Sequence, residues 1–160
     1  MYEYRAAQEL DWHLGNPFDP ECRFGFPSIV EFDESEEFPH ESVAALRRWG
    51  MGGYLVPEAY GGSFTSFEQM FALMRVISRR DLTVAVAYGA TLLGALPVWL
   101  HGSDELKRLL AHSIQQNDDF GAIGLTEEAH GSDLLSCECS AVRNGDSFIL
   151  SGEKWLINNG

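Results

Sequence analysis

Apolar side chains recur at helical spacing from about residue 39. Val43, Leu46 and Trp49 lie three residues apart, Pro39 suits a first helical turn, and Gly50 follows as a stop. The pattern predicts a short helix that ends at the glycine. A turn-rich segment, GMGG, comes next.

A second helix is predicted from Ser66 to Arg80. Ser66 and Gln69 have the spacing of a capping box, and Arg79 and Arg80 place positive charge where a helix C-terminus favours it. The predicted inner face consists of Phe67, Met70, Phe71, Met74 and Ile77.

Residues 84–100 are apolar on nearly every side, which predicts a central helix covered all round. The stretch is shorter than the roughly 20 residues of a membrane span and contains Gly89, Gly94 and Pro97, so we expect a buried helix and no membrane span. A fourth helix is predicted from Ser103. Its expected inner face consists of Leu106, Leu109, Leu110 and Ile114.

The periodicity changes near residue 119. Residues 120–125 form a short apolar run that predicts a strand, and residues 136–143 alternate. Asn144-Gly145 is the preferred two-residue turn of a hairpin whose second strand covers 146–151.

These elements predict a mainly α chain with a following β segment. Residues 1–118 would form a helical domain, opening with a loose, partly helical leader at residues 1–38. Residues 119–160 would begin a β-domain that is incomplete at residue 160.

Charge and cysteine content narrow the class of partner and compartment. The chain has 160 residues, and 11 basic against 24 acidic side chains give a net charge of −13. Nucleic acids and anionic membranes bind positive patches, so neither is an expected partner. Cys22, Cys137 and Cys139 form an odd set, and Cys137 and Cys139 lie too close to bridge each other comfortably. The N-terminus carries no secretory signal, so we expect a cytoplasmic protein. The spacing of His130 from Cys137 and Cys139 matches no common zinc site, and no metal is expected.

Residues 125–133 carry the strongest candidate chemistry. Hydroxyls, a glycine and a run of backbone amides could hold the edge of a polar heterocycle or a diphosphate, although the same composition also fits an ordinary loop. Glu127 and Glu128 could form a carboxylate pair, but adjacent acidic residues on a loop are expected to be solvated or capping.

Two motifs resemble the acyl-CoA dehydrogenase family of flavoproteins. Leu-Thr-Glu and Gly-Ser-Asp within residues 125–133 are followed at residues 152–159 by Gly-Glu-Lys-Trp-Leu-Ile-Asn-Asn. Pro57-Glu58 and Gly61-Gly62 support the match upstream. The resemblance implies an orthogonal helical bundle leading into the first strands of a β-barrel-like, flavin-binding middle domain.

The resemblance also implies the cofactor and its contacts. FAD would be bound by the two motifs: Thr126 would hydrogen-bond the pyrimidine side of the flavin, and Asn158 would lie near flavin N5. Ser132 would contact both the diphosphate and the acyl substrate, and α-helical residues around Ala85, Gly89 and Leu92 would line the acyl tunnel. The implied cofactor residues are Ile123, Leu125, Thr126, Gly131, Ser132, Leu156, Ile157 and Asn158.

The chain departs from the family pattern at four places. Glu128-Ala129 replaces the usual Pro-Gly, His130 replaces a small residue, Leu156 replaces an aromatic, and Asn158 replaces a threonine. These departures resemble a branch associated with specialised metabolism, in which the acyl group can be carried by a protein instead of free CoA.

By resemblance, the expected reaction is α,β-dehydrogenation of an acyl-CoA or acyl-carrier-protein thioester, with hydride transfer to FAD. No catalytic residue is assigned, because the family's catalytic carboxylate belongs to a C-terminal helical domain. An electron-accepting flavoprotein and a homodimer or homotetramer are the implied partners. Two alternatives stay open: a flavin oxidase or monooxygenase on the same scaffold, and a truncated, non-catalytic module that binds an acyl ligand or a partner.

Overall fold

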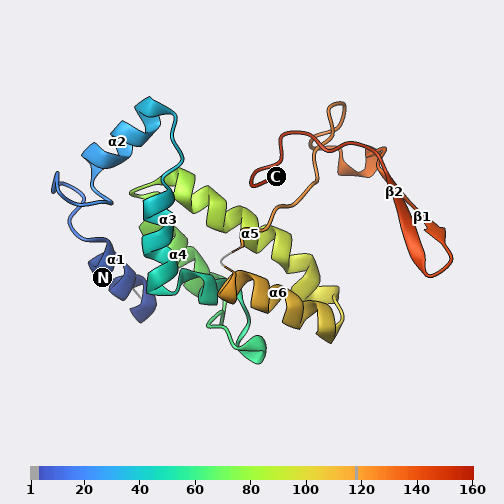
Figure 1. Ribbon diagram of the computed structural model, residues 1–160, viewed down its shortest axis with the longest axis horizontal. Helices are drawn as coiled ribbons and strands as arrows, with labels where there is room; N and C mark the ends of the chain where they lie inside the picture. Colours follow the sequence, from blue (N-terminus) through green and yellow to red (C-terminus); the bar gives the residue numbers. More distant parts are fainter. Residues whose placement is uncertain (1–3, 118) are drawn as a thin grey trace.

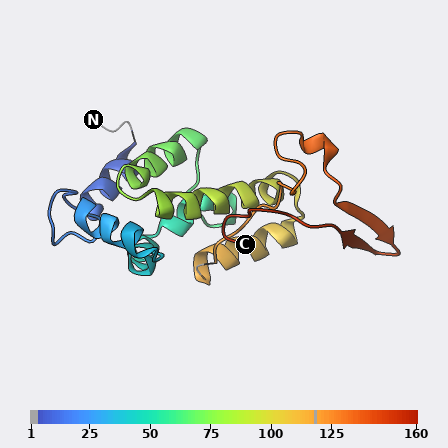
Figure 2. The same ribbon diagram turned by 90° about the horizontal axis from the view of Figure 1, so that it is seen from above.

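The computed structural model describes residues 4–117 and 119–160 as a helical bundle followed by a projecting β-hairpin (Figures 1 and 2). The mainly α class with a following β segment is confirmed. The helices are α1 (Arg5–Leu14), α2 (Phe26–Ser35), α3 (His40–Trp49), α4 (Phe67–Ser78), α5 (Leu82–His101) and α6 (Asp104–Gln116). Short 3₁₀ turns occupy Met51–Leu55, Glu58–Tyr60 and Leu134–Ser136, and the strands are β1 (Ser140–Asn144) and β2 (Ser147–Ser151).

Helix α1 belongs to the core of the bundle, so the expectation of a loose leader is wrong for residues 5–14. Ala7, Leu10 and Leu14 are at most 1% exposed, and α1 packs on α4. Burying a leucine side chain contributes about 1.5–3 kcal/mol, so these residues anchor the N-terminal segment firmly.

The start of α4 forms as predicted, with one difference. The Ser66 hydroxyl accepts a hydrogen bond from the Gln69 amide at 3.2 Å. The Gln69 side chain, however, accepts from the backbone and hydroxyl of Thr65, at 3.3 and 2.8 Å, one residue before the position that a capping box predicts.

The inner faces of α4 and α6 differ in part from the predicted ones. Phe67 and Phe71 are 44% and 64% exposed, and Leu106 and Leu109 are 44% and 65% exposed. The two helices contact their neighbours through a rotated face, because the packing partner decides which apolar side chains are covered. The buried residues are Met70, Leu73, Val76 and Ile77 in α4 and Ala111 and Ile114 in α6.

Helix α5 runs through the middle of the bundle and packs on α4 and α6. It has 20 residues, and an 18-residue stretch of it has a mean hydropathy of 1.6, so it is long and apolar enough to cross a membrane by length and composition. One side of it is nevertheless a core face that includes Val84, Tyr88 and Thr91. The prediction of a helix covered all round is wrong in this chain, because Leu82, Val86, Leu93 and Leu100 are 41–69% exposed. We call these four residues the α5 stripe.

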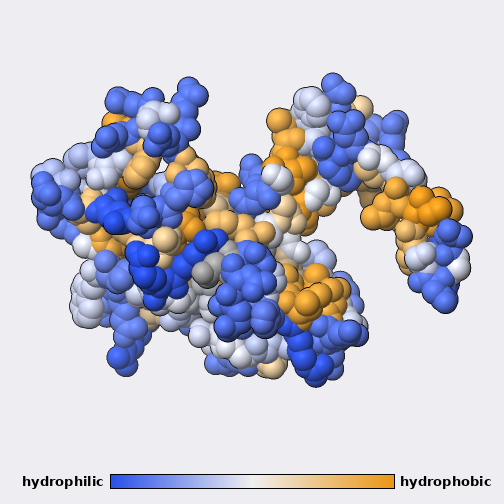
Figure 3. All heavy atoms as spheres, in the orientation of Figure 1, coloured by the Kyte–Doolittle hydropathy of each residue, from blue (hydrophilic) through white to orange (hydrophobic). Residues whose placement is uncertain are grey.

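The β-hairpin forms, but its turn is shifted by one residue. Asn144 pairs with Ser147, so the two turn residues are Gly145 and Asp146, and Gly145 has a φ of +64°. The predicted strand at residues 120–125 is an extended segment without ladder partners among the described residues. The hairpin projects from the bundle in both ribbon views, and Figure 3 shows hydrophobic side chains gathered on it.

Candidate functional site

A buried carboxylate holds three segments of the candidate site together. Glu127 is 7% exposed, and its carboxylate accepts hydrogen bonds from Lys154 Nζ at 2.8 Å and from the backbone amides of Glu138 and Cys139 at 2.7 and 3.0 Å. The expectation that Glu127 is solvated is therefore wrong, whereas its neighbour Glu128 is exposed. Sequence reasoning considered Glu127 but missed its contact with Lys154, although a Glu in one motif and a Lys in the other was the available signal.

The hydrogen bonds to Glu127 also fix its charge. The Lys154 ammonium, followed by the amide of Glu138, lowers the pKa of the Glu127 carboxyl far below its usual value. The same contact raises the pKa of Lys154. Both groups stay charged at neutral pH, so the three segments are joined by an ion pair and two charge-assisted hydrogen bonds.

The two sequence motifs lie side by side. The Trp155 amide donates to the Thr126 carbonyl at 2.8 Å, and Lys154 Nζ donates to the Leu125 carbonyl at 2.9 Å. Leu125 and Leu156 are 46% and 81% exposed. Two candidate cofactor segments, 29 residues apart between Leu125 and Lys154, thus form one partly apolar surface.

Leu156 has an unusual backbone conformation. Its φ is +54°, in the left-handed region that branched and bulky residues rarely adopt. Such strain costs of order 1–3 kcal/mol and is found more often at ligand-binding sites than elsewhere. The strained backbone and the exposed side chain are consistent with the expected flavin contact of Leu156, which stays a prediction.

The loop of residues 127–133 is held closed without the family's Pro-Gly. The Glu127 amide donates to the His130 carbonyl at 2.9 Å, and the His130 amide returns a bond to the Glu127 carbonyl at 3.1 Å. The Asp133 carboxylate accepts from the Gly131 amide at 3.1 Å and lies 2.8 Å from His130 Nδ1. This contact with Asp133 raises the pKa of His130 and lowers that of Asp133.

The donor set of the site suits a flavin nucleotide. Within residues 4–117 and 119–160, the side chains of Thr126, Ser132 and Asn158 make no hydrogen bond to protein, and Ser132 and Asn158 are exposed. A hydroxyl and an amide can donate hydrogen bonds to a diphosphate and to the polar edge of a flavin, and Leu156 offers an apolar surface. Gly131 and Ser132 lie at the outer end of the loop, and Ile157 is half-buried.

A cavity of about 430 Å³ joins the second motif to helix α5. Asn158 and Asn159 line one side of it, and Val86 and Ala87 of α5 line another. The cavity places the predicted flavin-facing segment directly beside the exposed side of α5.

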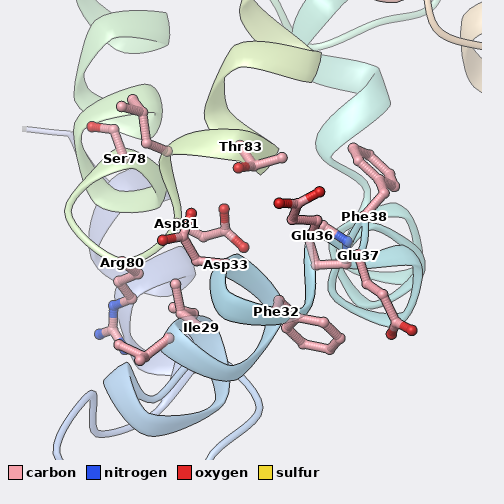
Figure 4. A pocket seen from close by; sticks show the side chains of 13 residues that line it. Ile29, Phe32, Asp33, Glu36, Glu37, Phe38, Ser78, Arg80, Asp81 and Thr83 are labelled. Atoms are coloured by element: carbon pink, nitrogen blue, oxygen red, sulfur yellow. The ribbon is translucent and has the colours of Figure 1, made fainter.

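A second cavity, of about 620 Å³, adjoins the first between α2 and the start of α5 (Figure 4). The two cavities share Asp33, Phe38, Leu82 and Thr83, so a groove leads from Asn158 toward α2. Asp33 of α2 and Asp81, the residue before α5, both line the second cavity and are labelled in Figure 4.

The structure separates the three α5 residues that were expected to line an acyl tunnel. Ala85 and Leu92 are 4% and 6% exposed and face the core instead of the α5 stripe, and their expected place in an acyl tunnel stays a prediction. Gly89 lies between them at intermediate exposure, and a Cβ there would meet only the Met74 methyl at 3.8 Å. The expected role of Gly89 stays a prediction, and Val86 and Leu93 are the exposed side chains that sequence reasoning missed.

The cysteines are reduced, and each thiol lies against a backbone carbonyl. Cys137 Sγ and Cys139 Sγ lie 3.7 and 3.5 Å from the carbonyl oxygens of Leu125 and Glu153. The described part of the chain contains no group of three or more His, Cys, Asp or Glu side chains that could hold a metal ion.

Comparison with known proteins identifies the helical part of the chain. A model of the acyl-CoA dehydrogenase N-terminal domain matches residues 25–117. A probable acyl-CoA dehydrogenase of Mycobacterium leprae is 31% identical over 84% of this chain, and the cyclohex-1-ene-1-carbonyl-CoA dehydrogenase of Geobacter metallireducens is 33% identical over the same share. The matched region spans 34% and 36% of those two proteins, about a third of their length.

Solved structures agree over the whole chain. Butyryl-CoA dehydrogenase from Megasphaera elsdenii superposes on all of it with a TM-score of 0.81 and 25% identity, covering 42% of that protein. An acyl-CoA dehydrogenase from Bacillus anthracis, solved with FAD, covers 95% of this chain and 25% of its own length with a TM-score of 0.72 and 30% identity. Nitroalkane oxidase, at 17% identity and a TM-score of 0.73, shares the fold alone.

Proposed function

The chain belongs to the acyl-CoA dehydrogenase family, and from that premise we propose that it forms part of the FAD and acyl site of an enzyme that desaturates an acyl thioester between its α and β carbons. FAD is the cofactor of this family, and the unsatisfied polar groups of the two adjacent motifs fit it. The observation that carries the proposal is the Glu127–Lys154 contact of 2.8 Å, which brings both motifs to one surface.

The two motifs have distinct roles in this proposal. When bound, FAD accepts the hydride that leaves the substrate. Thr126 would donate to the pyrimidine edge of the flavin, Leu156 would pack against its ring, and Asn158 would donate an amide hydrogen bond near N5. Gly131 and Ser132 hold the diphosphate, and Ser132 also contacts the acyl thioester.

Helix α5 supplies the surface for the acyl chain. Val86 and Leu93 exclude water from the acyl chain, because apolar side chains on one face of a rigid helix form a water-free contact surface for an apolar ligand. Gly89 leaves depth between them. We assign no proton-abstracting residue to this chain, because the family's catalytic carboxylate belongs to a C-terminal helical domain.

The remaining features of the whole protein are also proposals. We propose an acyl-CoA or acyl-carrier-protein thioester as substrate, an electron-accepting flavoprotein as redox partner, a homo-oligomeric assembly, and a cytoplasmic location. A role in specialised metabolism is supported by the departures at residues 128–130 and at Asn158.

The test uses the protein expressed from the complete gene. Its visible spectrum is recorded, and acyl thioesters of several chain lengths are added without oxygen. Bleaching of the flavin band supports the proposal. Rapid return of the band on admitting air, with peroxide formed, would show an oxidase instead. A colourless protein that takes up no added FAD would contradict the cofactor assignment and support a non-catalytic binding module.

A further inference from the structure

Asn159 joins the flavin-facing motif to helix α5. Its side-chain Nδ2 donates to the carbonyl of Ala87, inside α5, at 2.8 Å and to the carbonyl of Gly121 at 3.0 Å. These acceptors lie 72 and 38 residues away in sequence. One amide group therefore connects three segments that the chain places far apart.

The acceptors themselves are fixed by a second buried group. The Thr91 hydroxyl donates to the Ala87 carbonyl at 2.9 Å and accepts from the Gly121 amide at 3.0 Å, and Thr91 is 1% exposed. The Thr91 hydroxyl thus holds both acceptor residues, Ala87 through a buried hydrogen bond and Gly121 through a partly buried one, so a movement of the Asn159 side chain would break bonds to fixed partners.

The backbone of residues 121–122 packs closely against α5 at this junction. A Cβ on Gly94 would lie 2.6 Å from the Ala122 carbonyl oxygen, and one on Gly121 would lie 3.5 Å from the Thr91 carbonyl oxygen. The segment at residues 121–122 therefore runs directly along α5, with Asn159 hydrogen-bonded to both.

The backbone of Asn159 has the conformation that this bridge needs. Its φ is +61°, in the left-handed region that asparagine and glycine tolerate better than other residues. The turn brings the amide back onto α5, while the preceding Asn158 lines the cavity beside Val86.

We propose that Asn159 is a positioning residue that sets the spacing between the flavin-facing segment at residues 156–158 and the acyl-facing side of α5. This inference rests on the proposed function. Because hydride transfer depends steeply on the distance between donor and acceptor, a small displacement of this segment lowers the rate more than it lowers affinity.

Two variants separate the amide from the backbone. Asn159→Gly keeps the left-handed conformation and removes the amide. Asn159→Asp keeps the size of the side chain, but its carboxylate cannot donate and would face two carbonyl oxygens. Asn144→Gly, at the exposed end of β1, is the matched control.

The experiment uses the flavin-loaded protein from the complete gene and two readouts. In Asn159→Gly we expect kcat to fall by roughly tenfold, as for a misplaced reacting group, with little change in KM, FAD content or melting temperature. Asn159→Asp should lose at least as much. Hydrogen exchange, followed by mass spectrometry, should speed up at residues 156–160 and at Gly121, and Asn144→Gly should change neither readout.

Two results would overturn the inference. One is a kcat of the Asn159→Gly protein equal to that of the wild-type protein. The other is an unchanged rate of hydrogen exchange at residues 156–160 in Asn159→Gly. This rate reports on the hydrogen bonds of Asn159 whether or not the protein catalyses a reaction. If the wild-type protein is reduced by no acyl thioester, the proposed function fails, and faster exchange in Asn159→Gly would still show that Asn159 holds the segment.

Discussion

The Glu127 carboxylate and the Lys154 ammonium meet at 2.8 Å across 27 residues of sequence, with Glu127 buried and Lys154 29% exposed. A buried charge that loses its partner is costly, so this contact makes the position of each motif depend on the other.

Glu127→Gln should weaken FAD binding. The neutral amide loses the ion pair and presents an NH₂ group toward at least one donor, so we expect FAD affinity to fall by roughly tenfold, the factor that corresponds to one lost charge-assisted hydrogen bond. Flavin absorbance per mole of protein during dialysis measures the loss. Glu128→Gln, which changes the exposed neighbouring carboxylate, should retain flavin as the wild-type protein does, and equal losses in both variants would contradict the role of Glu127.

The pH dependence of stability should carry a contribution from His130. Asp133 raises its pKa, so the contact stabilises the fold fully below the unfolded value of about 6.5, and this contribution is lost as the pH rises through the higher folded value. We expect the melting temperature of the wild-type protein, relative to that of His130→Gln, to decline from about pH 6 to about pH 8. His112→Gln, on the exposed side of α6, is the control. A constant difference in melting temperature between the wild-type protein and His130→Gln over this pH range would show that the contact with Asp133 does not contribute to stability.

The same substitution should have opposite effects at two glycines of α5. At Gly89 a Cβ meets only a flexible methionine methyl at 3.8 Å, so Gly89→Ala should raise the free energy of unfolding by about 0.5–1 kcal/mol through helix propensity. At Gly94 a Cβ would lie 2.6 Å from the Ala122 carbonyl oxygen, so Gly94→Ala should lower the free energy of unfolding by about 1–3 kcal/mol.

Urea unfolding measures both changes. If Gly89 lines the acyl site, the ratio of kcat/KM for long acyl thioesters to kcat/KM for short ones should be lower in the more stable Gly89→Ala protein than in the wild-type protein. An equal kcat/KM ratio in the variant and the wild-type protein would remove Gly89 from the substrate site.

Leu156→Gly should separate stability from cofactor binding. Relief of the left-handed strain should raise the free energy of unfolding of the FAD-free protein by about 1 kcal/mol, while loss of the exposed side chain should weaken FAD binding. Urea unfolding without FAD and titration with FAD give the two quantities. Leu135→Gly removes an equally apolar and fully exposed side chain that belongs to neither motif and should not change FAD affinity. Unchanged FAD affinity in Leu156→Gly would exclude a contact with the ring.

Local features were predicted well because local forces determine them. The Ser66 cap, the glycine after α3 and the hairpin each depend on residues only a few positions apart. The hairpin turn was misplaced by one residue because the strand register, and not the Asn-Gly dipeptide alone, selects the turn positions. Inner faces were predicted less well: Phe71 and Leu109 fit an apolar period but stay exposed, because the neighbouring helices approach from another side.

By itself, the sequence determined helices α3 to α6 and the hairpin, the change of period near residue 119, and the two motifs whose residues and spacing resemble a flavoprotein family. Only the tertiary structure decided which carboxylate is structural, which face of α5 is open, and how Asn159 joins residues 87 and 121. The physical reason is that these three properties depend on contacts between residues 27 to 72 positions apart, and periodicity and capping carry no information over such separations.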